Sequence, residues 1–260
     1  MKNRIDRLFA REKRTRVMAH AVAGYPDPET SIAVVEQMAA SGADLIEIQI
    51  PFSDPLADGP TIMSACHRTL QNGFQVEDAL RMVERLKYRI STPIVIMTYV
   101  NVPYRMGFDR FVKATATAGA SGLIIPDLPF DEPEDDWMKM ARAEGIHPIS
   151  VISPGMDSRR LDRILKTASG FLYITLRIGT TGAGQAIAPE AIAFIGEVRK
   201  RSRLPIAAGF GVSSPEHAAL LKGKADIVIV GSRLIDAFHD AGGRGVSAFL
   251  KDLQRIMIQE

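Results

Sequence analysis

The chain has 260 residues, of which 46% are hydrophobic and 24% charged, as in an ordinary globular protein of the size of one α/β barrel. Its formal net charge of +2 suggests no nucleic-acid surface, and no run reaches the roughly 18 apolar residues of a membrane-spanning helix. Cys66 is the single cysteine and the first residues lack a signal peptide's apolar run, so we expect a cytoplasmic protein.

Short apolar runs alternate with longer amphipathic runs along the whole chain. The predicted strands occupy residues 17–23, 44–50, 93–99, 122–127, 148–153, 171–176, 205–209 and 226–230. The predicted helices occupy residues 4–10, 28–41, 61–72, 76–89, 108–118, 132–144, 158–167, 189–201, 215–221 and 246–258. Most of the strands are continuously apolar, which is typical of strands covered on both faces.

Eight strand-then-helix units allow either a closed barrel or a doubly wound open sheet. Eight units of roughly 25 to 35 residues favour the barrel. Because no linker or change in composition divides the chain, we predict that residues 1–260 form a single (β/α)8 TIM barrel with an extra N-terminal helix. The basic residues 11–16 fit a solvated loop, and the acidic residues 131–136 suit a helix N-terminus.

One acidic residue interrupts the second predicted strand. Glu47 must face either the barrel interior or the helix layer, and a buried carboxyl group is costly unless it is paired. The catalytic residues of such barrels lie at the C-terminal ends of strands. A structural glutamate bonded to a neighbouring hydroxyl is the alternative, but two more acids in the next loop favour a general acid–base role.

The loop after this strand carries Asp54 and Asp58 and is stiffened by Pro51, Pro55 and Pro60. An aspartate before Gly-Pro is also typical of a turn or a helix cap. Position alone therefore does not decide whether Asp58 has a functional or a structural role.

Glycines follow the seventh and eighth predicted strands. Gly209 and Gly211 follow the seventh strand, and Gly231 and Ser232 follow the eighth. Loops at these two places recur as phosphate sites in barrels, because glycine lets backbone N–H groups approach an anion closely. The pattern predicts a phosphorylated substrate.

The glycine-rich segment 177–184 follows the sixth strand and is long enough to form a mobile lid. They lack the strand–helix context and third glycine of a dinucleotide fingerprint. Tyr173, inside the sixth strand, is either a core residue or a proton partner of Glu47, and core packing is the simpler interpretation.

Two kinds of aldolase are disfavoured. The predicted strands and the residues just after them contain no lysine, which argues against a Schiff base. His20 is the only histidine on a predicted strand, and no second one is placed to complete a metal site. We therefore expect carboxylate acid–base chemistry on a small phosphorylated substrate, with no metal and no cofactor.

Residues 51–60, Pro-Phe-Ser-Asp-Pro-Leu-Ala-Asp-Gly-Pro, closely resemble the signature of the tryptophan synthase α-subunit family. The likeness continues in short motifs at residues 23–26, 126–129, 181–183, 209–211 and 231–232. The resemblance implies a lyase of tryptophan biosynthesis that cleaves indole-3-glycerol phosphate by a retro-aldol reaction to indole and D-glyceraldehyde 3-phosphate.

The resemblance also implies roles for single residues. Glu47 matches the acid–base residue that protonates C3 of the indole and takes the proton of the adjacent glycerol hydroxyl. Asp58 matches the carboxylate that accepts the indole N–H, and Tyr173 matches the tyrosine beside the glutamate. The matched substrate- and phosphate-binding residues are Gly182, Phe210, Gly211, Gly231 and Ser232.

The family's α subunit docks on a β subunit that holds pyridoxal phosphate, in an α2β2 complex, and passes indole to it through a tunnel. By resemblance, Asp54 and Pro55 after the second strand and Arg177 and Thr181 after the sixth supply lid and interface contacts. This chain itself is expected to bind no pyridoxal phosphate. The alternatives are a stand-alone paralogue that releases indole and a non-catalytic barrel that activates the β subunit.

Four places depart from the usual family pattern. Glu-Leu-Gly becomes Glu-Ile-Gln at residues 47–49, and Pro-Phe becomes Ala-His at residues 19–20, where the phenylalanine lines the indole pocket. Residues 176–182 differ from the usual lid motif Ser-Arg-x-Gly-Val-Thr-Gly, and Cys66 stands where an asparagine occurs. None of these changes removes a catalytic group.

Overall fold

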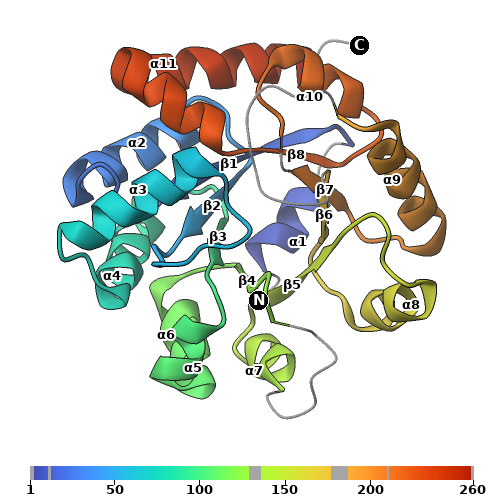
Figure 1. Ribbon diagram of the computed structural model, residues 1–260, viewed down its shortest axis with the longest axis horizontal. Helices are drawn as coiled ribbons and strands as arrows, with labels where there is room; N and C mark the ends of the chain where they lie inside the picture. The colour runs from blue at the N-terminus through green and yellow to red at the C-terminus, as the bar shows by residue number, and fades with distance from the viewer. Residues whose placement is uncertain (1–2, 11–12, 129–135, 177–186, 210, 259–260) are drawn as a thin grey trace.

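The computed structural model describes residues 3–10, 13–128, 136–176, 187–209 and 211–258 (Figure 1). Its strands are β1 (Arg16–Val22), β2 (Leu45–Gln49), β3 (Ile94–Met97), β4 (Gly122–Ile124), β5 (His147–Ile152), β6 (Leu172–Thr175), β7 (Ile206–Gly209) and β8 (Ile227–Val230). Each strand pairs in parallel with the next, and β8 pairs with β1, so the sheet closes on itself. The predicted (β/α)8 barrel is confirmed.

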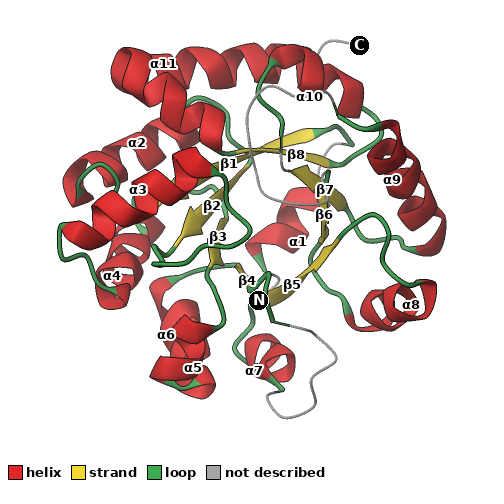
Figure 2. Cartoon of the chain, viewed as in Figure 1, coloured by secondary structure: helices red, strands yellow, loops and turns green. Residues whose placement is uncertain are grey.

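Helices surround the barrel, as Figure 2 shows. They are α1 (Arg4–Phe9), α2 (Pro28–Ala40), α3 (Pro60–Gln71), α4 (Val76–Lys87), α5 (Asn101–Met106), α6 (Phe108–Ala118), α7 (Trp137–Ala143), α8 (Ser158–Thr167), α9 (Pro189–Arg201), α10 (Pro215–Leu221) and α11 (Ser232–Ile258). The start of α2 follows the usual rules, since the Asp27 side chain accepts from the Thr30 N–H and Pro28 occupies the first turn. Within the described residues, no helix is both long and apolar enough to cross a membrane.

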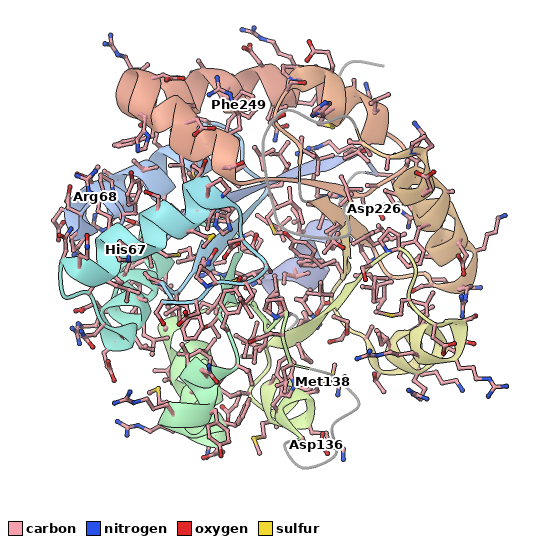
Figure 3. The ribbon with its side chains drawn as sticks, in the orientation of Figure 1. His67, Arg68, Asp136, Met138, Asp226 and Phe249 are labelled. Atoms are coloured by element: carbon pink, nitrogen blue, oxygen red, sulfur yellow. The ribbon has the colours of Figure 1, made fainter. Side chains whose placement is uncertain are left out.

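The strands separate two cores. Val17 and Ala19 of β1 belong to the cluster between strands and helices, whereas Met18 belongs to the cluster that fills the barrel. This alternation follows from the two-residue period of a strand, and it explains why both faces are apolar. Side chains occupy the centre of the barrel in Figure 3.

Helix α1 closes the N-terminal end of the barrel. Ile5 is fully buried in the barrel core, with Leu8 and Phe9 packed against the same cluster. The Asn3 amide donates to the carbonyl oxygens of Ser121 and Gly145, each at 2.8 Å, just ahead of β4 and β5. The barrel floor is therefore sealed.

Several element boundaries differ from the sequence prediction. Strand β4 ends at Ile124, and the short helix α5 was not predicted. Helix α11 begins at Ser232, well before the expected residue 246, and its backbone leaves helical geometry at Ala241 and Gly242. That break divides the apolar pattern, so only the second half was recognisable as a helix.

The structure also corrects two smaller expectations. Strand β5 begins at His147, so His20 is not the only histidine on a strand; His147 lies at the floor, with Nε2 3.1 Å from the Asp6 carboxylate of α1. Of the helix expected over residues 132–144, the described part starts at Trp137, with Asp136 as an N-cap residue whose side chain makes no capping bond.

Phe171 offers a test of the barrel core, because its ring is fully buried inside the barrel. We expect Phe171→Ala to lower the free energy of unfolding by about 3–5 kcal/mol through lost burial and the cavity left behind. Denaturation by urea measures the difference. Tyr88→Ala is the matched control, since Tyr88 is 78% exposed and its loss should change stability by no more than about 0.5 kcal/mol. Equal losses in the two variants would contradict the assignment.

Candidate active site

A pocket opens at the C-terminal ends of the strands. It brings together six residues singled out from the sequence, namely Glu47, Asp58, Tyr173, Gly211, Gly231 and Ser232. The other lining residues are His20, Ile62, Met97, Val212 and Ile229. The pocket therefore has acidic side chains on one wall and glycines on another, at the end of the barrel where catalytic residues gather.

The side chain of Glu47 faces the barrel interior. Leu45, two residues earlier on β2, belongs to the core inside the barrel, and the strand period places Glu47 on the same face. Glu47 is 3% exposed, and its Oε2 lies 3.3 Å from Nδ1 of His20, its register partner on β1. The carboxylate is thus buried but paired, as a buried charge must be.

Asp58 is held by two hydrogen bonds to the same carboxylate oxygen. Gln49 Nε2 donates to Oδ2 at 2.7 Å, and the Tyr99 hydroxyl donates to it at 2.9 Å. Burial raises the pKa of Asp58, while the charge of His20 and the bonds from Gln49 and Tyr99 lower it in part. The N-cap residue of α3 is Gly59, so Asp58 is not that helix's cap.

Gln49 and Tyr99 are site residues that the sequence prediction missed. The Ala57 N–H donates to the Tyr99 hydroxyl at 3.1 Å, so this phenol links the loop to β3. A signal was available for Gln49, because it lies two residues after Glu47 and must share its face. The sequence signal for Tyr99 was weaker, because it was only the last residue of a predicted strand.

The free thiol of Cys66 lies beside this network. Gln49 Nε2 is 3.6 Å from its sulfur, and the residue is buried on α3. Burial raises the pKa of Cys66 to about 12, so the side chain is a neutral thiol at physiological pH.

Tyr173 rises from β6 on the opposite side of the pocket. Burial, followed by the charges of Glu47 and Asp58, raises its pKa well above the ordinary value, which keeps the phenol neutral. A side chain at Gly209 would put its Cβ 2.9 Å from the Tyr173 hydroxyl, closer than real Cβ contacts. Gly209 therefore leaves the space that this hydroxyl occupies.

The glycine wall lies after β7 and β8. Gly211 has a φ of +107°, a backbone conformation that side chains disfavour. Gly231 follows β8 directly, and Ser232 is the first residue of the long helix α11. A helix N-terminus approached through glycine exposes N–H groups to an anion.

The remaining predicted residues divide into two groups. Asp54 is exposed and accepts from the Ser53 hydroxyl at 2.6 Å, whereas Pro55 is buried. The residues that lie outside the described ranges are Arg177, Thr181, Gly182 and Phe210. Within the described part of the chain, His, Cys, Asp and Glu side chains form no group of three that could hold a metal ion.

The closed barrel, with a pocket at the C-terminal ends of its strands, has the architecture of a (β/α)8-barrel enzyme. The family model for the tryptophan synthase alpha chain matches residues 8–256. The chain belongs to the tryptophan synthase alpha chain family, and its activity is that of an aldol-type lyase in tryptophan biosynthesis.

Individual relatives agree with this assignment along nearly their whole length. The tryptophan synthase alpha chain of Carboxydothermus hydrogenoformans is 41% identical, covering 92% of this chain and 90% of its own. That of Desulforapulum autotrophicum is 38% identical, covering 94% and 96%. Among solved structures, tryptophan synthase of Mycobacterium tuberculosis superposes with a TM-score of 0.89 at 34% identity, covering 99% of this chain and 97% of its own.

The raised pKa of Asp58 predicts a pH-dependent cost to stability. The folded chain binds this proton more tightly than the unfolded chain, so stability falls as pH rises through the interval above the ordinary aspartate value of 3.8. Asp58→Asn removes the charge and keeps an oxygen that can accept from both donors. We expect its stability advantage over the wild type to grow with pH in that interval and then level off, as measured by urea denaturation at a series of pH values. An advantage independent of pH would contradict this.

Proposed function

We propose that this pocket cleaves indole-3-glycerol phosphate to indole and D-glyceraldehyde 3-phosphate, with Glu47, Asp58 and Tyr173 as its catalytic residues. The observation that carries the proposal is the convergence of two buried carboxylates on one pocket whose other wall is formed by Gly211, Gly231 and Ser232. One wall suits proton transfer and the other suits a phosphate group.

Glu47 moves the protons. Its carboxyl group delivers a proton to C3 of the indole, and its carboxylate takes the proton of the hydroxyl on the neighbouring side-chain carbon. That hydroxyl carbon becomes the aldehyde as the carbon–carbon bond breaks. The bonding pair returns to the ring and neutralises the charge that C3 protonation created there, so the atoms and electrons balance.

Asp58 stabilises this positive charge. Its carboxylate accepts the indole N–H, and the donors Gln49 and Tyr99 both bind Oδ2, which leaves Oδ1 for the substrate. Tyr173, kept neutral by burial, is the hydroxyl partner on the far side of the pocket.

The phosphate of the substrate binds at the glycine wall. Gly231 and Ser232 present backbone N–H groups at the start of α11, and Gly211, after β7, lines the same pocket. Gly182 and Phe210 belong to the same binding set by family resemblance. The indole ring itself receives the electrons, so this chain needs no cofactor; pyridoxal phosphate belongs to the partner.

The partner that we propose is the tryptophan synthase β subunit, in an α2β2 complex. Large apolar side chains beside the pocket mouth support it: Leu56, in the loop after β2 with Asp54 and Pro55, is 81% exposed, and Tyr104 of α5, just after β3, is 74% exposed. Arg177 and Thr181 are proposed to add contacts from the loop after β6.

We also propose that residues 1–260 form one catalytic domain that works in the cytoplasm. The first and last strands pair with each other, so the barrel needs both halves of the chain to close. A small phosphorylated substrate and a free buried thiol suit a reducing compartment.

Substitution of either carboxylate tests the chemistry. We expect Glu47→Gln and Asp58→Asn to fold and to lower kcat for indole release by about a hundredfold or more, because proton transfer and charge stabilisation are each lost. Glu36→Gln is the matched control, since that exposed carboxylate of α2 pairs with Arg89 at 2.9 Å, away from the pocket. Normal turnover in the Glu47 variant would overturn the proposal. Undetectable indole release by the wild type, alone and with the β subunit, would favour the non-catalytic alternative.

Binding of the β subunit separates the complex from the stand-alone alternative. We expect the purified chain to bind the β subunit and to release indole faster in its presence. Leu56→Asp should weaken binding at least tenfold by placing a charge in an apolar contact, whereas Leu220→Asp, on α10 and 51% exposed, should bind normally. Titration with the β subunit measures both. Indole release without any binding would establish the stand-alone paralogue.

A further inference from the structure

A histidine lies beside the proposed acid–base residue, and the mechanism above does not use it. His20 on β1 is the register partner of Glu47 on β2, so both side chains point into the barrel. His20 is 5% exposed and lines the same pocket. The strand register therefore fixes the pair, because a shift by one residue would turn His20 toward the helices.

The two side chains meet through defined atoms. Nδ1 of His20 lies 3.3 Å from Oε2 of Glu47. An ionised carboxylate can only accept, so Nδ1 carries the hydrogen and donates it. The bond fixes the direction of Oε2 and leaves Oε1 for the substrate.

The other ring nitrogen distinguishes His20 from an ordinary core histidine. Nε2 is buried, and no atom of the described residues bonds to it. A histidine kept for packing normally has its buried nitrogens satisfied. Among the described residues, Glu47 is thus the polar partner of this ring, and it lies at the proposed reaction site.

We propose that His20 is a positioning residue for Glu47, donating a hydrogen bond to Oε2 that keeps Oε1 aimed at the substrate. This inference rests on the proposed function, in which Glu47 moves both protons. In this role His20 acts through Glu47.

The charges around the ring support this role. The titratable groups that face it are Glu47 on β2, Asp58 in the following loop, Tyr173 on β6 and Tyr25 in the loop after β1. Burial lowers the pKa of His20, but the bond to Glu47 and the charges of Glu47 and Asp58 together raise it above its ordinary value of 6.5. The ring therefore keeps its positive charge at higher pH than a free histidine does, which strengthens the hydrogen bond that it donates.

The consequence for catalysis is a change in kcat. Without the donor, Oε2 is no longer held and Oε1 is less well aimed at the substrate, so the chemical step slows. A side chain that restores a donor to Oε2 restores kcat.

Two variants separate positioning from packing. His20→Phe keeps a ring of similar size without the donor, and His20→Asn is smaller but offers an amide N–H to the carboxylate. We expect His20→Phe to lower kcat at saturating substrate about tenfold, because Glu47 loses its fixed direction. His20→Asn, which keeps a donor, should recover most of that loss although its side chain is smaller. Met18→Leu, inside the barrel one inward position earlier on β1, should keep the wild-type kcat.

A wild-type kcat in His20→Phe would overturn the inference, and so would a larger defect in His20→Asn than in His20→Phe, since that order indicates packing. If the Phe variant does not fold, His20→Asn is compared with His20→Ala, and an equal loss of kcat in those two overturns the inference. Glu47→Gln measured alongside keeps the two proposals apart. Full activity there removes the proposed function, whereas an inactive Glu47→Gln with a wild-type kcat in His20→Phe removes only this inference.

Discussion

The proposed active site depends on how two buried carboxyl groups are held at the barrel mouth. A buried polar group is tolerated only with partners close enough to replace water. Glu47 has His20 from β1, and Asp58 has Gln49 from β2 and Tyr99 from just after β3. The donors thus come from three neighbouring strands or the residues that follow them, and the alignment of those strands decides whether the donors meet the acids.

The same register divides the mouth into two chemical halves. The strands β1 to β3 carry the acids and their donors, while the segments after β7 and β8 carry glycine and a helix N-terminus. Because β8 pairs with β1, these halves are neighbours, and a molecule with a ring at one end and a phosphate at the other can span them. Barrel closure therefore sets the distance over which the substrate is held.

Much of the architecture was accessible from the sequence, because strands covered on both faces are continuously apolar and regularly spaced. The boundaries were less accessible: the backbone break at Gly242 hid the first half of α11, and nothing in the pattern marked α5. For the site, position predicted Glu47, but Asp58 stayed ambiguous, because a loop aspartate before Gly-Pro has the same sequence whether it caps a helix or faces a pocket. In the folded chain Gly59 is the N-cap residue of α3, and Asp58 lines the pocket with its carboxylate bound by Gln49.

Helix α1 fills the N-terminal end of the barrel, which affects where substrate enters and products leave. Ile5 is buried in the barrel core, with Leu8 and Phe9 against it, so the described residues fill the floor. The pocket opens at the C-terminal ends of the strands, and substrate and products share that opening. A partner that covers this opening therefore controls both entry and departure. A partner bound at Leu56 and Tyr104 would lie at the only described exit from the pocket and could take the aromatic product before it reaches water.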